Sequence, residues 1–462
     1  MNVPEPSSFR DPSGRLVRRA EGALCRQVTA AGLADLDLLT ASGLAAELIG
    51  SERLIPFREA ERGAEGALLE LEELPFVSYP WEWPPEALRD AALLTCDVAL
   101  AALERGMTLK DAGACNIGWR GSHPVFLDHG SFTAYREGEP WRPLRQFIAH
   151  FLGPLLLVKY RHSPEYLLLA GDFPDGLPID FVAHELPWRS RLSPSVLLHI
   201  HCHAALEARG AARREEGPER RRTLPRSSFR AMLLGLREML LGMEFRLRGS
   251  EWSGYYRDTN YTEDAFAAKR EAVAAFAAAV RPRRVIDFGA NNGLFSCIAG
   301  RHAEVTVAAD LDFAAVSALY RRLRSEDDRK VHPVRIDLNV PSPGSGLFNR
   351  EHLPFLARAK GDLAMGLALI HHLRIGANWH WEHIARLFAE SAPAALVEFV
   401  PESDSQVRRL LRTRERIHDD WDLDSARAAF GRFYRSCEVL PLPGSERSLL
   451  LLRDRIGGET AR

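Results

Sequence analysis

Residues 285 to 296 read VIDFGANNGLFS, an apolar strand followed by a glycine-containing turn and the start of a helix. A side chain at Gly289 would block the approach of a ligand to the backbone. Asn291 is among the few non-glycine residue types that tolerate a positive φ, and Gly293 opens the helix whose free N–H groups face the turn. The strand carries Asp287 just before the turn. This segment therefore predicts a doubly wound α/β sheet whose first turn holds a nucleotide-like cofactor.

Acidic residues also end the next apolar segments. EVTVAAD ends at Asp310, and VHPVRID ends at Asp337. A carboxylate at the tip of the second strand of such a sheet accepts hydrogen bonds from both ribose hydroxyls, and an acid after the third strand can meet an adenine amino group. We therefore predict that Asp310 and Asp337, with Leu311 and Leu338 that follow them, bind the cofactor. A fourth strand, DLAMGLALIHHL, is predicted to begin at Asp362.

The spacing of the turn separates two classes of cofactor. A dinucleotide site requires G-x-G-x-x-G, whereas this turn reads D-x-G-x-N-x-G. It resembles motif I of the class I S-adenosylmethionine-dependent methyltransferases, and Asp310, Asp337 and Asp362 fall where later motifs of that family fall. The resemblance implies a Rossmann-like sheet of seven strands, S-adenosyl-L-methionine as cofactor, and methyl transfer. The alternative is a doubly wound domain in which the glycine turn only packs a helix on a strand.

The length of the chain requires a second domain. A methyltransferase fold of about 200 to 250 residues fills only half of the 462 residues. The clearest boundary is the mixed-charge stretch EARGAARREEGPERRRTLPRS, which has few apolar side chains. We predict an N-terminal α+β domain over residues 1–205, a charged linker over 206–229 and the methyltransferase domain over 230–462.

Bulk composition narrows the class of protein. The net charge is -2 and 46% of the residues are hydrophobic, which favours a globular protein and gives no indication of nucleic acid or of a membrane surface as a partner. The six cysteines include no C-x-x-C pair, so neither a disulfide framework nor a zinc knuckle is indicated. The N-terminus lacks an apolar signal core. A cytoplasmic location is expected, and the excess of arginine over the five lysines suggests a GC-rich bacterial genome.

The N-terminal half carries a second constellation, LKDAGACNIGWRGSHPVFLDHGSF. Asp111 precedes Asn116 by five residues, and Asp128 follows a predicted hairpin. This is the order of the catalytic loop and the metal-binding acid in protein kinases and small-molecule phosphotransferases, where the Asn and the second Asp hold Mg²⁺. The alternative is that the three residues are polar caps of a hairpin and its turns. Upstream we predict a hairpin of GRLVRR and ALCRQV, a single helix over DLDLLTASGLAAELIG, strands at LIPF and ALLELEEL, and a long helix after SYPWEWP.

The departures from a kinase pattern matter as much as the match. No G-x-G-x-x-G loop precedes the hairpin, and Leu109 and Lys110 stand where His and Arg usually do. The position of the kinase lysine is held by Arg26, which could pair with Glu47 but would not reproduce the point contact of a lysine with phosphate. Three interpretations stay open: a scaffold that presents an acceptor, a phosphotransferase with a regulatory cofactor-binding half, and a binding protein without turnover.

Candidate bases follow the fourth and fifth predicted strands. Methyl transfer is an in-line displacement that mainly requires alignment of the acceptor and exclusion of water. His371 and His372 are the best placed general bases, because imidazole titrates near neutral pH and strand ends face the cofactor crevice. The alternative is that these histidines cap a helix or serve in packing. Glu398, on the apolar strand ALVEFVP, is either a substrate or cofactor contact or a member of a structural ion pair. The segment RFYRSCEVLPLPGSERSLLLLR is predicted to be the closing antiparallel hairpin.

Two further clusters of residues give weaker indications of function. In HIHCH, His199 and His203 lie one helical turn apart, but no third and fourth ligand is visible nearby, so we predict no metal site. Aromatic residues ahead of motif I could cover the cofactor or simply pack a helix on the sheet. These residues are Trp252, Tyr255, Tyr256 and Tyr261.

Taken as a whole, the sequence resembles the bacterial family typified by the NoeA nodulation proteins. The resemblance rests on YPWEWP, LKDAGACNIGW, RQFIAHFLGPLLL, FGANNGLFS, LALIHHL and EFVPESDSQVRRLL, with SFRDPSG near the start. It implies methyl transfer and leaves the acceptor undefined. We predict a small-molecule or saccharide acceptor, with no nucleic acid and no membrane as partner. The residues do not select among O-, N- and C-methylation, and they leave the oligomeric state open.

Overall fold

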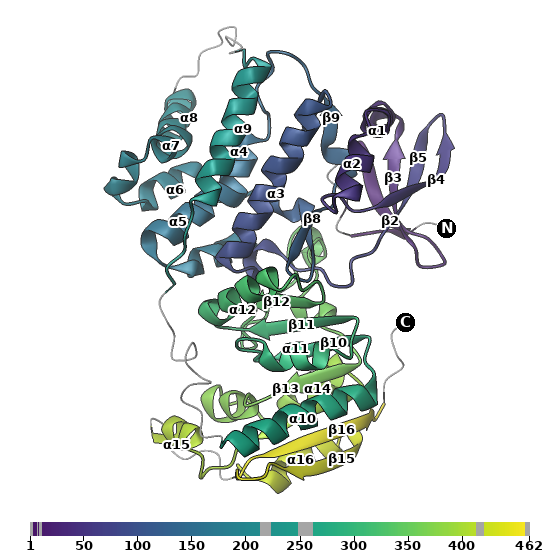
Figure 1. Cartoon of the computed structure of the whole chain (residues 1–462), viewed down its shortest axis with the longest axis vertical. Coiled ribbons are helices and arrows are strands. Elements are labelled where there is room, and N and C mark those ends of the chain that lie inside the picture. Colours follow the sequence, from purple (N-terminus) through teal and green to yellow (C-terminus); the bar gives the residue numbers. More distant parts are fainter. Residues whose placement is uncertain are drawn as a thin grey trace. The chain divides into compact units, whose positions relative to one another are not determined.

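The computed structural model divides into two compact units, which are described separately (Figure 1). The first comprises Met1–Arg248 with the short segment Gly344–Leu353, and the second comprises Gly249–Pro343 with Pro354–Arg462. The described residues are 3–6, 8, 12–212, 223–247, 262–412 and 420–457.

The N-terminal unit begins with a five-stranded antiparallel sheet in the order β1-β2-β3-β5-β4. Its strands are β1 Val3–Pro4, β2 Gly14–Arg18, β3 Leu24–Thr29, β4 Phe57–Gly63 and β5 Gly66–Leu71. The predicted hairpin is present as β2 and β3. The predicted strand at LIPF is confirmed only at its last residue, because β4 begins at Phe57, and Leu54 makes just an isolated bridge to Phe126.

One predicted helix in this region is broken. The structure has α1 Ala30–Ala41 and α2 Leu44–Gly50 instead of a single helix. Gly43 between them has a φ of 77°, a left-handed conformation that ends a helix and that glycine adopts without steric cost.

The rest of the unit is mostly helical. The long predicted helix is α3 Pro85–Glu104, and the predicted hairpin around Trp119 is β7 Ile117–Arg120 with β8 His123–Phe126. A further pair is formed by β6 Met107–Leu109 and β9 Phe132–Ala134. The remaining α-helices are α4 Leu144–Phe147, α5 Gly153–Arg161, α6 Ile179–Glu185, α7 Pro194–Val196, α8 His203–Ala212 and α9 Arg226–Leu241.

The C-terminal unit is built on a seven-stranded sheet in the order β12-β11-β10-β13-β14-β16-β15. The first five strands in this order pair in parallel, and β16 pairs antiparallel with β14 and with β15. The strands are β10 Arg284–Phe288, β11 Val305–Asp310, β12 Val331–Arg335, β13 Leu363–Gly366, β14 Ala394–Phe399, β15 Tyr434–Pro441 and β16 Ser448–Arg455. The predicted fourth strand is too long, because β13 ends at Gly366, before the two histidines.

Helices cover both faces of this sheet (Figure 1). Because side chains alternate along a strand, Val285 and Met365 pack in the core cluster with α10 and α11. Phe288 faces the opposite way and meets Phe388 of α14 edge to face. The helices are α10 Glu263–Val280, α11 Leu294–Gly300, α12 Phe313–Ser325, α13 Phe355–Arg358, α14 Trp381–Ser391, α15 Ser405–Arg412 and α16 Leu423–Gly431.

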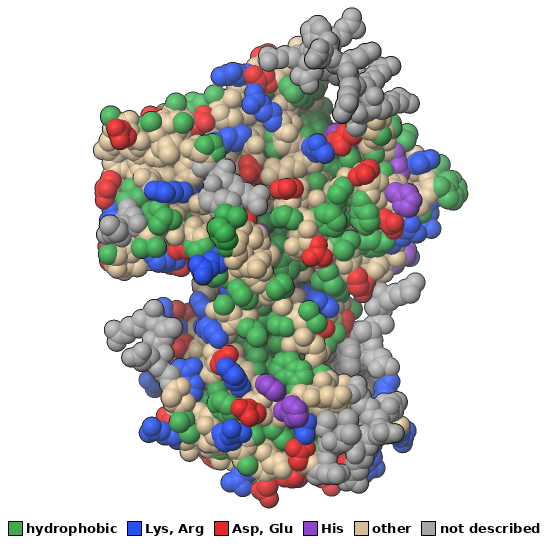
Figure 2. All heavy atoms as spheres, turned by 180° about the vertical axis from the view of Figure 1, so that it is seen from behind, with side chains coloured by type: hydrophobic (Ala, Val, Ile, Leu, Met, Phe, Trp, Pro, Cys, Tyr) green, Lys and Arg blue, Asp and Glu red, His purple; other side chains and the backbone are tan. Residues whose placement is uncertain are grey.

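The surface mixes charges of both signs. Figure 2 shows Lys and Arg side chains interspersed with Asp and Glu over the visible face, as a net charge of -2 would lead one to expect. Among the described helices, none is both long enough and apolar enough to cross a membrane.

Candidate functional site

The turn after β10 needs residues that accept left-handed backbone. Gly289, Asn291 and Gly293 have φ values of 72°, 50° and 70°. A Cβ atom at Gly289 would lie 3.1 Å from the Leu369 side chain, and one at Gly293 would lie 2.5 Å from Leu319. The N–H of Gly289 also donates to the carbonyl of Ala309 on β11 (2.8 Å). The turn is therefore held against the neighbouring strand in a form that larger residues would disrupt.

Asp310 ends β11 beside this turn. Its carboxylate accepts hydrogen bonds from the backbone N–H of Asn291 (2.7 Å) and of Asp312 (2.9 Å). Burial raises the pKa of Asp310 to about 6, against the lowering effect of these hydrogen bonds. A carboxylate has about four lone-pair sites, so acceptor capacity remains for hydroxyl donors. The side chain of the next residue, Leu311, is 51% exposed and offers an apolar surface beside the acid.

Asp287 is placed differently from Asp310. Asp287 is only 3% exposed, and its carboxylate accepts a hydrogen bond from the Ser296 hydroxyl (2.6 Å). Burial raises the pKa of Asp287 to about 7, and the hydrogen bond from Ser296 opposes that shift. The carboxyl group thus ties β10 to α11 beneath the turn.

The remaining predicted acids, Asp337 and Asp362, lie at opposite ends of the parallel strands. Asp337 follows β12, accepts a hydrogen bond from the N–H of Asn339 (2.9 Å), and is followed by the half-buried Leu338. Asp362, in contrast, precedes β13 and accepts from the N–H groups of Arg283 (2.8 Å) and Arg284 (2.9 Å) at the start of β10. Asp362 thus lies at the start of the fourth strand of the chain order, as predicted, and secures the amino edge of the sheet.

The two histidines lie in the turn and short helix that follow β13. His371 is fully buried, and neither of its ring nitrogens has a hydrogen-bond partner within the described structure. Its ring centroid lies 4.1 Å from that of His372. Burial, together with the nearby His372, Arg447 and Lys269, holds the pKa of His371 well below its usual value, and burial lowers the pKa of His372 to about 4. Both imidazoles are therefore neutral at physiological pH.

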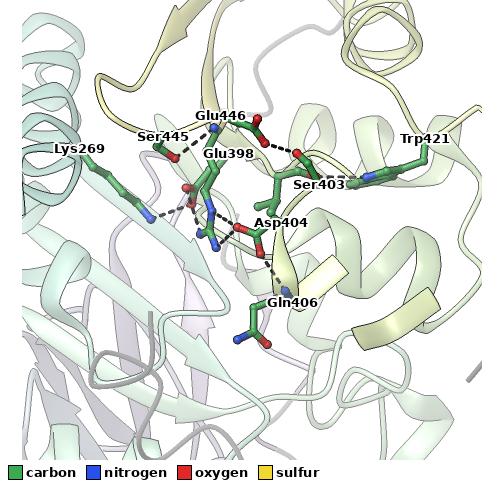
Figure 3. Close-up of polar contacts among 10 residues, drawn as sticks. Lys269, Glu398, Ser403, Asp404, Gln406, Trp421, Ser445 and Glu446 are labelled. Carbon is green, nitrogen blue, oxygen red and sulfur yellow. Dashed lines mark hydrogen bonds and ion pairs between the residues drawn. The ribbon is translucent and has the colours of Figure 1, made fainter. Parts of the chain in front are cut away.

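Glu398 belongs to a buried ion-pair chain (Figure 3). It is 0% exposed, contacts Lys269 Nζ of α10 at 2.7 Å, and lies 3.6 Å from Arg447. Arg447 in turn donates to Asp404 Oδ2 through Nε (2.9 Å) and Nη2 (2.8 Å). Of the two roles predicted for Glu398, the ion pair is the one that the structure forms.

The sequence analysis did not identify Lys269 and Arg447, the two cationic residues of the ion-pair chain. Burial lowers the pKa of Lys269, and the Glu398 charge opposes the shift. A signal was present: Lys269 stands at helical spacing between Phe266 and Val273, on the apolar face of an alanine-rich helix. A charged residue on such a face needs a buried partner.

A cavity of about 490 Å³ lies elsewhere in the C-terminal unit. The cavity runs along α14 and is lined by Trp379, His380, His383 and Leu387, among others. None of the predicted cofactor residues lines it, so its position gives no support to the predicted site.

Two interpretations of the N-terminal unit can also be tested against the structure. Arg26 does not pair with Glu47. Instead it contacts Asp128 at 2.6 Å, and Glu47 pairs with Arg105 of α3 at 2.8 Å. Within HIHCH, His203 lies 3.6 Å from Glu207, and no group of three or more metal-ligating side chains occurs among the described residues. The four aromatic residues of the predicted cover lie outside the described residues.

Nodulation protein NoeA of Rhizobium meliloti is 32% identical over 453 residues, which cover 96% of this chain and 94% of that protein. The chain belongs to the NoeA family. This confirms the family resemblance predicted from the sequence. The chain matches no family model.

Solved structures resemble parts of this NoeA-family chain. A crystal structure of WbdD is 20% identical and covers 44% of this chain and 43% of that chain, with a TM-score of 0.28. The N-methyltransferase NodS of Bradyrhizobium japonicum is 9% identical and covers 42% of this chain and 97% of that chain, with a TM-score of 0.31. Both likenesses cover less than half of the chain.

Proposed function

We propose that this NoeA-family protein is an S-adenosylmethionine-dependent methyltransferase of class I. The observation that carries the proposal is the meeting of the Gly289–Gly293 turn with Asp310 at the carboxyl edge of a parallel sheet. Ligands of open α/β sheets bind at this edge, where the strand order reverses. The reversal lies at β10, between β11 and β13, and β10 leads directly into the turn.

The side chains at this edge fit the cofactor. Asp310 would bind both ribose hydroxyls with its remaining lone pairs, and Leu311 would pack against the adenine ring. Asp337 and Leu338 would meet the adenine edge, and the left-handed turn at Gly289 would leave room for the amino-acid part. When bound, the cofactor supplies a methyl group on a sulfonium, which is already activated for transfer.

His371 and His372 are proposed to contact the acceptor. A buried imidazole with two unpaired nitrogens is costly, and an acceptor hydroxyl or amine would satisfy His371. Because both rings are neutral, either can accept a proton that the acceptor loses as the new bond forms. The acceptor is proposed to be a small molecule or a saccharide, and the N-terminal unit, with its kinase-like order of residues, to select or present it.

Calorimetry with S-adenosylhomocysteine tests the cofactor site. Asp310→Asn should weaken binding at least about tenfold, since hydrogen bonds to a charged group contribute about 1.5–3 kcal/mol each. Gly289→Arg should abolish binding. Asp362→Asn is the matched control, because it changes an acid at the opposite edge of the same sheet and should leave affinity unchanged. Equal affinity of wild type and Asp310→Asn would refute the proposed site.

Turnover requires a separate experiment. Labelled methyl donor is incubated with the full chain and cell extract, and the products are separated. A labelled product formed by wild type and lost in Gly289→Arg supports transfer. Cofactor binding without any labelled product would favour the binding protein without turnover.

A further inference from the structure

The N-terminal unit contains a carboxylate, Asp128, whose charge is neutralised by an arginine of the same chain, Arg26. Asp128 Oδ1 accepts a hydrogen bond from the N–H of Gly130 (3.1 Å) and contacts Arg26 Nη2 at 2.6 Å. The other oxygen, Oδ2, accepts from the Ser131 hydroxyl, which also accepts from Asn116 Nδ2 (3.3 Å). Both oxygens of the acid expected to bind metal therefore have partners within the protein.

Arg26 is fixed in this position by the sheet. It lies on β3, between Leu16 of β2 and Leu69 of β5, and is only 8% exposed. Burial alone would raise the pKa of Asp128, but the charge of Arg26 and the hydrogen bond from Ser131 outweigh it and lower the pKa. The result is an ionised carboxylate with a permanent guanidinium as its counter-ion.

The groups next to Asp128 are themselves affected by burial. Burial lowers the pKa of His129 to about 4, so this residue is neutral, and its Nε2 is 2.9 Å from the carbonyl of Ile55. Burial and the nearby Asp128 raise the pKa of Asp111. A divalent cation at Asp128 would thus meet a guanidinium and a carboxylate that is already paired.

The cavity that Arg26 lines is also far smaller than a nucleotide. A cavity of about 20 Å³ lies between the sheet and the loops that carry Lys110 and Gly130. This is room for about one water molecule, whereas ligand pockets usually measure about 300–1,000 Å³. The side chain of Lys110 reaches across to the Ser13 hydroxyl (3.0 Å).

We propose that Arg26 is a built-in cation that takes the place of a divalent metal ion at Asp128, so that the N-terminal unit binds no magnesium nucleotide and transfers no phosphoryl group. The residues that resemble the catalytic loop and metal-binding acid of a kinase then serve to join the sheet to the loops after β6 and β8. This inference does not depend on methyl transfer by the C-terminal unit.

Thermal unfolding of the full chain with MnCl₂, with and without ATP, tests the proposal. Manganese suits carboxylate and amide oxygens and reports on a magnesium-type site. The wild-type Tm should be unchanged by manganese with ATP. Arg26→Met removes the guanidinium and keeps an apolar side chain of similar length, so its Tm should fall, and manganese should raise the Tm of this variant.

Two controls make the result specific. Adding Asp128→Asn to Arg26→Met should abolish the response to manganese, and Arg105→Met, which breaks the exposed pair with Glu47, should show no response. Equilibrium dialysis of wild type against Mn-ATP gives an independent readout if Arg26→Met does not fold. Retention of Mn-ATP by wild type that is lost in Asp128→Asn would overturn the proposal, and so would an Arg26→Met variant that folds and ignores manganese.

Discussion

Asp310 and Asp128 are both carboxylates beside a strand of a sheet, yet their surroundings differ. Asp310 is held by backbone N–H groups and forms no ion pair with an Arg or Lys side chain of the described residues, whereas Asp128 contacts Arg26. Backbone donors orient a carboxylate and leave it able to bind a ligand, while a buried guanidinium supplies its counter-ion from within the chain. The comparison teaches that an acid at a strand end indicates a binding site only when the chain does not neutralise it.

Glu398 extends the comparison to a fully buried ion pair and carries the largest expected effect. Glu398→Gln would leave Lys269 and Arg447 without their shared counter-ion, so the free energy of unfolding of the C-terminal unit should fall by about 3–5 kcal/mol. Urea unfolding measures this change. The double variant Lys269→Met with Glu398→Leu should recover part of the loss. A fall of less than about 1 kcal/mol in Glu398→Gln would contradict a stabilising role for the chain of ion pairs.

The pH dependence of the free energy of unfolding should distinguish the carboxyls of the C-terminal unit from Asp128. The pKa of Asp287 is raised to about 7 and that of Asp310 to about 6, so these two carboxyls bind more protons in the folded unit than in the unfolded chain between about pH 4 and 7. Their contribution to the free energy of unfolding should therefore fall as pH rises through this window, by at most about 1.4 kcal/mol per pH unit for each group, whereas the lowered pKa values of His371 and His372 contribute in the opposite direction. The pKa of Asp128 is lowered, so its stabilising contribution is lost only as pH falls below about 4.

Urea unfolding at a series of pH values, followed by fluorescence, checks this difference. Asp287→Asn removes the carboxyl with the higher of the two pKa values, so the downward contribution of this group to the slope between about pH 6 and 7 should disappear relative to wild type. A slope that Asp287→Asn leaves unchanged would assign the pH dependence to other groups.

The smallest expected effect concerns the exposed ion pair between Glu47 and Arg105, which contrasts with the buried pair between Arg26 and Asp128. The Glu47 and Arg105 side chains are 43% and 46% exposed, so Arg105→Met should change the free energy of unfolding by less than about 1 kcal/mol, and added salt should reduce the difference further. Urea unfolding at low and high salt measures it. A loss as large as that in Arg26→Met would show that burial does not separate these two arginines.

Local patterns predicted much of the fold because they reflect local physics. The alternation and apolar content of β10, β11 and β14 indicated strands, and the left-handed backbone at Gly289 and Asn291 followed from residue type. The breaks were harder to see: Gly43 ends a helix that the pattern would continue, and Leu367 to His372 leave the sheet although the run stays apolar. An apolar run shows that residues are buried, but not in which kind of element.

By itself the sequence determined the family, the glycine-containing turn and the order of the acids along the chain, since all of these depend on residue type and spacing. Only the tertiary structure decided which charges meet. Arg26 and Asp128 are 102 positions apart in the chain, and Lys269 and Glu398 are 129 apart, so no local pattern pairs them. Coulomb energy depends on distance in space and on burial, and these are set only when the sheets and helices pack.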